Sequence, residues 1–526
     1  MDDSENSHGY RHDLGPETVV VTAQQMQQIE TCLFEAGLPV PALMEKVAGQ
    51  ITQWLVHHYP RDRAPVAGII VGPGHNGGDA LVVARELHHR GYQVRSWCPF
   101  PQLKPLTAQH QAYLGYLGIP CAPHSDELME CDFIVDGGVG IGLTKPLSGE
   151  FATGIEALNA ANRPIVSIDL PSGLDTDSGT ALGTAVRATH TLCLGLWKLG
   201  LLQDAAQPWL GQSHLIPFDI PQAAIEATLP SSPSHRRLTA ADAIARLPLP
   251  RSPVAHKYTA GHALLIAGSR KYGGAALLAG RGAMSSGVGM LTLVVPESLR
   301  ATALSQFPEA LVLGAQETAT GAIAALPAAM AWDQYDAVAC GPGLTLESAT
   351  VMEAAWACDR PLVFDADGLN YLSQRDPRRM IDERQAATLL TPHPGEFRRL
   401  FPDIWAQAAT PSAAARQAAL AGCTVVLKGA ISIVAHPGEP VWLNPTSTSA
   451  LARGGSGDVL TGLAVGLAAQ LMQRQLSGSE ALLATAIAAV WWHAQTGIAL
   501  TAERSVLGCS ASQLASHLPT VLASLL

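Results

Sequence analysis

Short apolar runs that end in glycine- or proline-containing turns recur along the chain, and this pattern constrains its fold most. In the first half the runs are "VAGIIVG" (residues 66–72), "YQVRSWC", "CDFIVDGG" and "RPIVSIDLPSG". The first run leads into "GGDALVVARELHHRG", which has helical apolar spacing and stops at Gly91. Alternating strands and helices of this kind predict a doubly wound, parallel α/β sheet with ligands at the carboxyl ends of its strands.

The second half repeats this alternation with other sequences. The runs "HALLIAGS", "LTLVVP", "YDAVACGPG", "RPLVFDADG", "ATLLTPHPGE" and "CTVVLKGAISIVA" are predicted strands, separated by alanine-rich helical stretches. Because 526 residues exceed what one hydrophobic core usually organises, two domains are expected. The Pro- and Ser-rich segment "PSSPSHRRLTAADA" favours a linker between them. We predict a disordered tail at residues 1–20, a first domain at 21–229, a linker at 230–240 and a second domain at 241–526.

Composition disfavours several classes of function. The formal net charge is -11 and there is no basic block, which argues against DNA or RNA as a partner. The most apolar segment, residues 481–492, is too short to span a bilayer, so we expect a buried helix and no membrane partner. The nine cysteines form no CxxC pair, and the polar N-terminus lacks signal-peptide features. These observations predict a cytoplasmic protein without a zinc or disulfide framework.

Polar clusters in the first half follow predicted strands. "GPGHNGGDA" (residues 72–80) is a glycine-rich turn that can cradle a pyrophosphate through backbone N–H groups, although it is not the GxGxxG fingerprint. The alternative is a tight turn with Asp79 as a helix cap, but Asn76 and Asp79 both offer oxygen ligands. Asp136 and Asp169 end apolar strands, where a buried carboxylate needs a partner, hydrogen bonds or a cation. Their alternative role is to cap loops.

In the second half the stretch "LARGGSGDVLTG" places Asp458 at a glycine-rich helix start, a position that attracts anions. His393 in "PHPGE" and Lys428 also follow strands, which favours one shared cleft. Alternatively, His393 is a rigid loop histidine and Lys428 a solvated charge at a strand end. Asp365 and Asp367 suggest a metal pair, but "DADGLN" is equally compatible with a turn and cap, and no metal is assigned there.

The first-half stretches resemble, in the same order, the N-terminal epimerase domain of the YjeF family of bifunctional NAD(P)H-hydrate repair enzymes. They are "VTAQQMQQIE", "LMEKVAG", "GPGHNGGDALVVARELHHRG", "IVDGGVGIGL" and "IDLPSGLD", and the similarity covers residues 21–218. The resemblance implies a Rossmann-like, three-layer domain and a potassium site made of Asn76, Asp136 and Ser172, whose oxygen ligands suit a hard cation. It implies catalysis by Asp136 and Asp169. The implied hydrate contacts are His75, Asn76, Gly77, Gly78, Asp79, Gly140, Ile141, Gly142, Leu143, Thr144, Lys145, Pro146 and Asp169.

Three positions depart from the family pattern in this half. His75 stands where the family usually has Asn, Ile141 where it has Thr, and Lys46 where it has Asn. The first two changes remove amide or hydroxyl groups from the implied site, so contacts at these positions are expected through the backbone.

The second-half motifs resemble the C-terminal dehydratase domain of the same family over residues 238–526, again in order. They are "HKYTAGHALLIAGS", "YGGAALLAGRGAMSSGVGMLTLV", "GPGL", "FDADGLN", "TPHPGE", "VVLKGA" and "ARGGSGDVLTG". The resemblance implies a ribokinase-like α/β fold. The implied nucleotide contacts are Lys428, Gly429, Ala430, Ile431, Ser432 and Gly457, and the implied hydrate contacts are Ala275, Gly343, His393 and Asp458.

The implied activity is repair of hydrated NADH and NADPH, called NADHX and NADPHX. The first domain is expected to interconvert the R and S epimers, and the second to dehydrate the S epimer with consumption of an adenine nucleotide. The fused architecture resembles bacterial members, so ADP is the expected co-substrate and ATP the alternative, with Mg²⁺. A phosphoryl group would turn the ring hydroxyl into a leaving group, and Asp458 would take the hydroxyl proton.

Two other classes remain as alternatives. One is a ribokinase-like small-molecule kinase fused to a nucleotide-binding domain, and the fused epimerase-like half argues against it. The other is a non-catalytic binding protein, against which the acidic residues Asp136, Asp169 and Asp458 argue. The sequence leaves the oligomeric state open, a homo-oligomer included.

Overall fold

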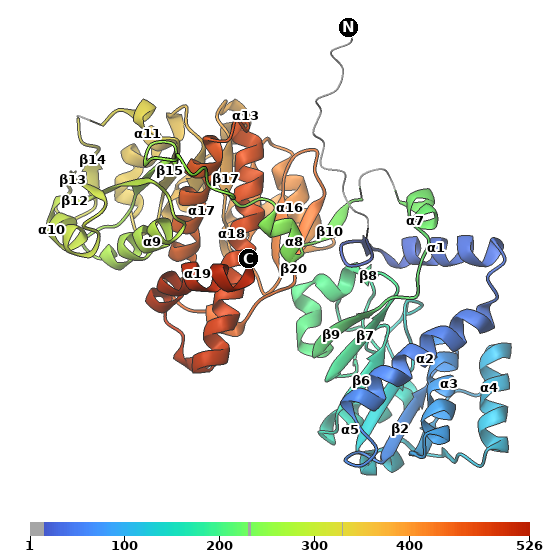
Figure 1. Ribbon diagram of the computed structural model, residues 1–526. Helices are drawn as coiled ribbons and strands as arrows, with labels where there is room; N and C mark the ends of the chain where they lie inside the picture. Colours follow the sequence, from blue (N-terminus) through green and yellow to red (C-terminus); the bar gives the residue numbers. More distant parts are fainter. Residues whose placement is uncertain (1–14, 230–232, 329) are drawn as a thin grey trace, which may run out of the picture. The chain divides into compact units, whose positions relative to one another are not determined.

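The computed structural model describes residues 15–229, 233–328 and 330–526, and the chain divides into two compact units, Met1–Arg237 and Leu238–Leu526 (Figure 1). The expected tail and linker fall partly on residues 1–14 and 230–232, which lie outside the described residues. Each unit is an α/β structure built on one main sheet, as the alternation of apolar runs predicts.

The first unit contains a seven-stranded sheet with the order β4-β3-β2-β5-β6-β7-β9, and all neighbouring strands in it are parallel. The strands are β2 (Val66–Val71), β3 (Gln93–Trp97), β4 (Cys121–Ala122), β5 (Phe133–Gly137), β6 (Ile165–Ile168), β7 (His190–Leu194) and β9 (Gln212–Ile216). The principal helices are α1 (Ala23–Glu35), α2 (Val40–His58), α3 (His75–His89), α4 (Pro105–Tyr116), α5 (Gly149–Ala160) and α7 (Gln222–Thr228). The four runs predicted as strands in this half are β2, β3, β5 and β6.

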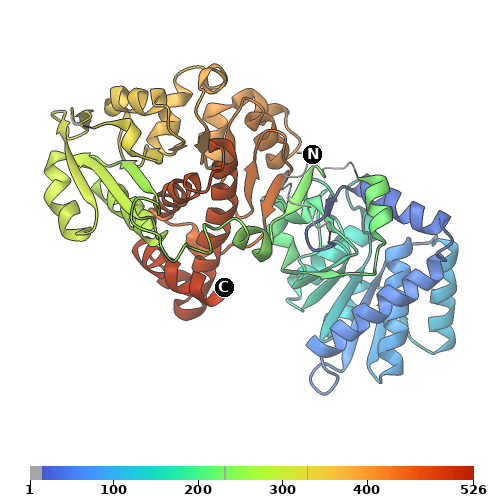
Figure 2. The same cartoon turned by 45° about the horizontal axis from the view of Figure 1, so that its top comes forward.

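Successive side chains in these strands enter two different cores, one on each face of the sheet. Ile69 of β2 packs in the core that contains residues of α1 to α4, whereas its neighbour Ile70 packs with Phe151 and Ile155 of α5. The helices α2, α3 and α4 lie side by side, as the blue ribbons of Figures 1 and 2 show. Burial on both faces explains why the strands are continuous apolar runs, and it gives the three layers expected of a Rossmann-like domain.

The second unit contributes the strands β20-β19-β18-β17-β16-β15-β11-β12-β13-β14, in that order, to its sheet. Neighbours from β18 to β13 are parallel, and the strands at both ends of this series are antiparallel. The strands are β11 (His262–Ile266), β12 (Met290–Pro296), β13 (Leu311–Glu317), β14 (Ile323–Ala325), β15 (Ala337–Cys340), β16 (Leu362–Phe364), β17 (Thr388–Leu390), β18 (Thr424–Leu427), β19 (Ser432–Ala435) and β20 (Val441–Asn444).

Helices α9 and α17 pack closely in this unit. The helices are α8 (Ala240–Ile244), α9 (Gly273–Ser285), α10 (Glu297–Gln306), α11 (Ala349–Ala357), α12 (Asp367–Ser373), α13 (Pro377–Glu383), α14 (Pro394–Leu400), α15 (Pro402–Gln407), α16 (Pro411–Ala419), α17 (Ser456–Met472), α18 (Gly478–Arg504) and α19 (Ala511–Leu525). A Cβ at Gly282 of α9 would lie 2.3 Å from the carbonyl oxygen of Val459, and one at Gly462 of α17 would lie 1.8 Å from that of Ala279. Glycine on both helices therefore permits the close backbone contact that fixes the start of α17.

The predicted tail and linker differ from the structure at their inner ends. Val19 and Val20 are 1% and 3% exposed, and β1 (Val20–Val21) pairs with β8 (Trp197–Lys198). Arg236, inside the predicted linker, is 2% exposed in β10 (His235–Arg237) and forms a bridge with Val19. Residues 15–20 are therefore not a disordered tail, because their valines bury apolar surface and pair with the segment that was expected to be a linker.

One other expectation needs revision, and another is confirmed. The run "CTVVLKGAISIVA" is a hairpin of β18 and β19 and not one strand, because the chain turns between Lys428 and Ile431. The apolar segment at residues 481–492 lies inside α18, which is 27 residues long and buried over most of its length. No helix among the described residues combines the length and apolar character needed to cross a membrane.

Candidate active sites

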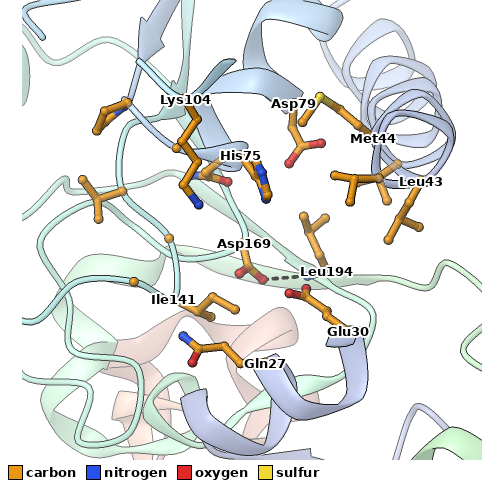
Figure 3. Close-up of a pocket in the computed structure, with 18 of the residues that line it drawn as sticks. Gln27, Glu30, Leu43, Met44, His75, Asp79, Lys104, Ile141, Asp169 and Leu194 are labelled. Carbon is orange, nitrogen blue, oxygen red and sulfur yellow. Dashed lines mark hydrogen bonds between the residues drawn. The ribbon is translucent and has the colours of Figure 1, made fainter. Parts of the chain in front are cut away.

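The first unit has a cavity of about 530 Å³ at the carboxyl ends of its strands (Figure 3). Helix α1 contributes Gln27 and Glu30 to its lining, and the start of α3 contributes His75, Asn76 and Asp79. The loops after β5 and β6 contribute Gly138, Val139, Gly140, Ile141, Gly142 and Asp169. The structure thus brings together residues from both glycine-rich turns and Asp169, as the sequence predicts for an α/β sheet.

The turn between β2 and α3 needs glycine because two backbone segments approach closely. A Cβ at Gly72 would lie 1.6 Å from the carbonyl oxygen of Gly138, and a Cβ at Gly77 would lie 2.0 Å from that of Gly72. Glycine at these positions sets the end of β2 against the loop after β5 and directs the first turn of α3 at the cavity. Gly78 is buried against Met44 and does not line the cavity.

Asp136, at the end of β5, is fully buried and accepts four hydrogen bonds. Its Oδ1 accepts from the Ser172 hydroxyl at 2.6 Å and the Gly138 N–H at 3.1 Å, and its Oδ2 accepts from the Ser167 hydroxyl at 2.8 Å and the Ser172 N–H at 2.9 Å. Burial raises the pKa of this carboxyl, and the hydrogen bonds oppose the rise. Asp136 does not line the cavity. Its hydrogen bonds to Gly138 and Ser172 link the loop after β5 to the loop after β6.

Asp169 and Lys198 form a buried ion pair below the cavity. The Lys198 Nζ donates to Asp169 Oδ1 at 2.5 Å and to the Leu194 carbonyl at 2.5 Å, and the Leu194 N–H donates to the same Asp169 oxygen at 3.1 Å. Burial acts to lower the pKa of Lys198, but Asp169 and its other neighbours outweigh this and raise it. Asp169 adopts a φ of +67°, which bends the chain directly after β6 and presents the carboxylate to the cavity.

Two further carboxyl groups line the same cavity. Burial raises the pKa of Glu30 to about 7, and the charges of Lys198 and Lys104 oppose this rise while Asp169 adds to it. Burial, with Asp169 and Glu30, also raises the pKa of Asp79 well above its usual value. The cavity therefore holds an ion pair and two carboxyl groups that retain protons more readily than carboxyls in water.

The loop of residues 140–146, which the resemblance implies contacts the hydrate, lines the cavity only in part. Gly140, Ile141 and Gly142 line it, whereas Leu143, Thr144, Lys145 and Pro146 continue along the loop outside the lining. The side chain of Ile141 faces the cavity (Figure 3), so the departure from the family pattern places an apolar group there. At His75, the other departure, partial burial lowers the pKa of the ring, and Lys104 adds to this effect.

In the second unit Asp458 lies in the first turn of α17. Gly455 caps this helix with a φ of +90°, a conformation that glycine adopts readily. Burial raises the pKa of Asp458 to about 6; Asp365 adds to the rise and Lys428 opposes it. Burial also lowers the pKa of His493 to about 4, and its Nε2 lies 3.0 Å from the Ser456 carbonyl oxygen at the start of α17.

Lys428 and Asp365 form a second buried ion pair beside Asp458. The Lys428 Nζ donates to Asp365 Oδ1 at 2.9 Å, and the Thr461 hydroxyl, one turn after Asp458, donates to Asp365 Oδ2 at 2.6 Å. Burial acts to lower the pKa of Lys428, but Asp365 and Glu396 outweigh it and raise the pKa. Lys428 is therefore a partly buried, positively charged group held in an ion pair, and not a solvated charge at a strand end.

Of the other residues implied by the resemblance in this unit, Gly457 lies near the ion pair, and Gly343 lies against Ala275. A Cβ at Gly457 would lie 3.5 Å from the Lys428 Nζ, and a Cβ at Gly343 would lie 2.9 Å from the Ala275 Cβ. Gly429 and Ala430 are exposed in the turn of the β18–β19 hairpin, while Ile431 is buried and Ser432 begins β19. The structure therefore places Lys428 against the helix start and leaves the turn after it open to solvent.

The alternative interpretations of His393 and of the aspartate pair find support in the geometry. His393 caps α14, since its Nδ1 accepts from the N–H groups of Gly395 and Glu396 at 3.0 and 3.3 Å. Asp367 accepts from the Thr345 N–H at 2.9 Å and begins α12. Within the described parts of the chain no group of three or more His, Cys, Asp or Glu side chains is arranged to hold a metal ion.

Sequence reasoning missed four residues of these sites: Glu30, Lys198, Thr461 and Glu396. Lys198 had a usable signal, because a lone lysine inside the apolar stretch "LCLGLWKLGLL" must find a buried acidic partner. Glu30 lies on an amphipathic helix where a charged residue ordinarily faces solvent. No pattern in the sequence marks it as a cavity residue.

The two folds and sites define a class of protein: a two-domain α/β enzyme with a carboxylate–lysine pair at the carboxyl ends of the strands in each domain. A sequence profile described as NAD(P)H-hydrate dehydratase matches residues 263–520, and one described as YjeF-related protein N-terminus matches residues 40–200. The bifunctional NAD(P)H-hydrate repair enzyme Nnr of Thermosynechococcus vestitus is 49% identical over 508 residues, which cover 95% of this chain and 97% of that protein. The chain therefore belongs to the family of bifunctional NAD(P)H-hydrate repair enzymes.

More distant relatives show the same two-domain coverage. The bifunctional NAD(P)H-hydrate repair enzyme of Leishmania braziliensis is 31% identical over 521 residues, which cover 93% of this chain and 89% of that protein. Among solved structures, the ADP/ATP-dependent NAD(P)H-hydrate dehydratase from Bacillus subtilis, co-crystallised with ATP and Mg²⁺, is 32% identical with a TM-score of 0.44. The match covers 55% of this chain and 98% of the Bacillus subtilis chain.

Proposed function

We propose that this chain repairs hydrated NADH and NADPH in two steps: epimerisation in the first unit and nucleotide-dependent dehydration of the S epimer in the second. The observation that carries the proposal is the presence, on one chain of this family, of two separate ion pairs beside further carboxyl groups. Asp169 and Lys198 form the pair in the first unit, and Asp365 and Lys428 form the pair beside Asp458 in the second. The relatives match both halves, which supports two activities in one protein.

For the dehydration, Asp458 is the proposed base. A ring hydroxyl is a poor leaving group, and transfer of a phosphoryl group to it allows phosphate to leave instead. With a pKa of about 6, Asp458 is ionised at neutral pH and still basic enough to take the hydroxyl proton. Lys428 and the first N–H groups of α17 supply the positive field that a transferring phosphoryl group needs.

The proposed phosphoryl donor is ADP, and Mg²⁺ accompanies it. Asp365 is engaged by Lys428 and Thr461, Asp367 accepts a backbone N–H, and within the described residues no group of three or more His, Cys, Asp or Glu side chains is arranged to hold a metal ion. We therefore place Mg²⁺ mainly on the nucleotide phosphates. When bound, the ion would neutralise negative charge on the transferring group.

For the epimerisation, the cavity of the first unit is the proposed site, with Asp169 against the hydrate. The turn that carries His75, Asn76 and Asp79 and the loop residues Gly140 to Gly142 supply the walls. Leu143 to Pro146 do not line this cavity. We therefore propose that they contact a part of the substrate that extends out of the cavity.

A potassium ion is proposed near Asp136, Ser172 and Asn76. The donors fit a hard cation in type, because they are a carboxylate, a hydroxyl and an amide oxygen. Asp136 and Ser172 are in direct contact, and Asn76 lies against the loop after β5, since a Cβ at Gly140 would be 3.5 Å from its Cγ. A bound cation would supply a fixed positive charge below the loop after β5. Comparing epimerisation in K⁺ with that in tetramethylammonium tests this site, and equal rates would rule it out.

The cytosol is the proposed location, because all nine cysteines are free thiols. Thiols of this kind persist in a reducing compartment. Fractionation of the native host cells, followed by activity measurement, would check this.

The experiment that tests the function uses the full chain with a mixture of R and S hydrates and either ADP or ATP. Recovery of reduced-nicotinamide absorbance should reach the whole of the mixture with ADP. Recovery of the S fraction alone would remove the epimerase proposal. Accumulation of a stable phosphorylated product would instead identify a small-molecule kinase, and absence of turnover would identify a binding protein.

A further inference from the structure

Glu30 is an acidic residue of α1 inside the cavity of the first unit; it ends the stretch "VTAQQMQQIE" but is not among the site residues predicted from the sequence. Its neighbour on the same helix face, Gln27, lines the same cavity one turn earlier. Figure 3 shows the Glu30 carboxyl group pointing into the cavity toward Asp169. The cavity therefore receives a carboxyl group from a helix outside the sheet as well as one from the end of β6.

The two carboxyl groups differ in what holds them. Asp169 is committed to an ion pair with Lys198 and to the Leu194 N–H. The side chain of Glu30 accepts no hydrogen bond and forms no ion pair within the described parts of the chain. A carboxyl group that is enclosed in a cavity and not bonded to the protein is free to bond to whatever enters the cavity.

The substrate of an epimerase of this kind needs such a group. In the hydrate, the carbon that changes configuration carries a hydroxyl and is bonded to the ring nitrogen. Loss of the hydroxyl with its electron pair leaves a planar carbon, and return of water to the opposite face gives the other epimer. Hydroxide is a poor leaving group at neutral pH, so the oxygen must receive a proton as the C–O bond breaks.

We propose that Glu30 is the acid and base of the epimerisation, a role that rests on the function proposed above. The Glu30 carboxyl gives its proton to the hydroxyl oxygen, which leaves as water while the lone pair of the ring nitrogen forms the C=N bond. Water then adds to the other face of the planar carbon, the C=N electrons return to nitrogen, and the Glu30 carboxylate takes the released proton. One water leaves and one returns, and the protein ends in its starting state.

The surroundings of Glu30 agree with this task. The charged and titratable groups that face it are Lys198 and Asp169 below the cavity, Lys104 before α4, and Asp79 on α3. Together with burial they hold its pKa at about 7, so both its acid and its base form are present at neutral pH. Asp169, held by Lys198 at the cavity, would stabilise the positive charge of the planar intermediate.

The test compares full-length Glu30→Gln with wild type, starting from the pure R hydrate in the absence of nucleotide and following the R-to-S conversion by chromatography. Glu30→Gln should lower kcat by roughly 10²- to 10⁴-fold, with KM changed by less than about threefold. In H₂¹⁸O the wild-type product should carry one solvent oxygen per inversion. The decline of the wild-type rate above about pH 7 should be absent in the variant.

Two matched variants make the result decisive. Glu35→Gln removes the same charge from the exposed end of α1 and should leave epimerisation unchanged. Glu30→Asp keeps a carboxyl group and should remain at least about tenfold faster than Glu30→Gln. Turnover of the S hydrate with ADP by the second unit serves as the reference in every preparation.

The outcomes separate this inference from the proposed function. A wild-type chain that does not interconvert the hydrates would refute the function of the first unit. If the wild-type chain interconverts the hydrates, two results would overturn only the role of Glu30. One is a kcat of Glu30→Gln within threefold of the wild-type value, and the other is equal kcat values for Glu30→Gln and Glu30→Asp. Retention of the original oxygen in the product would overturn the loss and return of water.

Discussion

Replacing Asp458 with Asn should stabilise the second unit while it abolishes most of the dehydration. The carboxylate is partly buried at the start of α17, where burial and Asp365 raise its pKa from 3.8 to about 6. Asn keeps the size and the capping capacity of the side chain but cannot be ionised or take a proton. Dehydration of the S hydrate should fall by roughly 10²- to 10⁴-fold, the usual scale for a lost general base.

The change in stability follows from the same pKa. A carboxyl whose pKa is raised by folding holds its proton more tightly in the folded state, so its ionisation opposes folding. The loss of folding stability caused by ionised Asp458 is absent below pH 3.8 and complete above pH 6. Multiplying the rise of about two pKa units by 1.36 kcal/mol gives about 3 kcal/mol at pH 8, and about half of that at pH 5. The Asp458→Asn substitution would remove this cost, so the stability gained over wild type should grow as pH rises.

The assay is urea denaturation of both proteins at pH 5 and pH 8, together with S-hydrate turnover on the same preparations. Asp403→Asn is the control, because Asp403 also lies in the first turn of a helix but is exposed. We expect no comparable gain there. Equal stability of wild type and Asp458→Asn at both pH values would refute the electrostatic reasoning, and near-normal turnover would show that Asp458 is only a cap.

Three other changes probe the packing and charge around the sites. Lys428→Met leaves the buried Asp365 carboxylate without its ion pair and should lower the unfolding free energy by about 3–5 kcal/mol. It also removes a charge that opposes the rise in the pKa of Asp458, so the acid limb of the dehydration pH profile should move above pH 6, and an unchanged profile would contradict this coupling. Asp136→Ala leaves the donors of a buried carboxylate unpaired and should impair epimerisation but not S-hydrate dehydration, so equal loss of both activities in a folded protein would contradict the assignment. Gly282→Ala places a Cβ 2.3 Å from a carbonyl oxygen of α17 and should cost about 1–3 kcal/mol by calorimetry, whereas Gly274→Ala on the same helix, with open space around it, should cost nothing.

The positions of most of the main strands along the chain could be predicted because each of these strands is a short apolar run with a glycine or proline after it. Strands buried on both faces leave this signal without any long-range information, as the alternate burial of Ile69 and Ile70 in two cores illustrates. The hairpin at Lys428 was missed because its two strands are apolar and adjacent in sequence, so the turn between them is marked only by "KGAI". The pairing of Val19 with Arg236 was missed for a different reason. It joins residues from opposite ends of the unit, and no local pattern predicts such a contact.

The candidate site residues also differ in whether a local sequence pattern predicts them or whether they depend on contacts between distant segments. Asp169 and Asp458 follow from local sequence, because each stands at the point where a strand or a glycine-rich turn presents side chains to a ligand. What each carboxylate can do depends on its neighbours, and these come from distant segments. Lys198 is 29 positions from Asp169, and Asp365 is 63 positions from Lys428. Protonation states are therefore a property of the fold and could not be predicted from the motifs alone.

The two units share one electrostatic arrangement, which the proposed reactions would use in opposite directions. In each unit a lysine forms an ion pair with one aspartate; burial raises the pKa of a second carboxyl nearby, the aspartate adds to this rise, and the lysine opposes it. In the first unit the second carboxyl is Glu30, with a pKa of about 7, so about half of it carries a proton at pH 7 and can protonate a leaving hydroxyl. In the second unit it is Asp458, with a pKa of about 6, so about nine-tenths of it is ionised at pH 7 and can accept a proton from the acceptor hydroxyl. In the proposed reactions the first carboxyl gives a proton and the second takes one; in each unit burial raises the pKa of that carboxyl, and the neighbouring aspartate and lysine act on it in opposite directions.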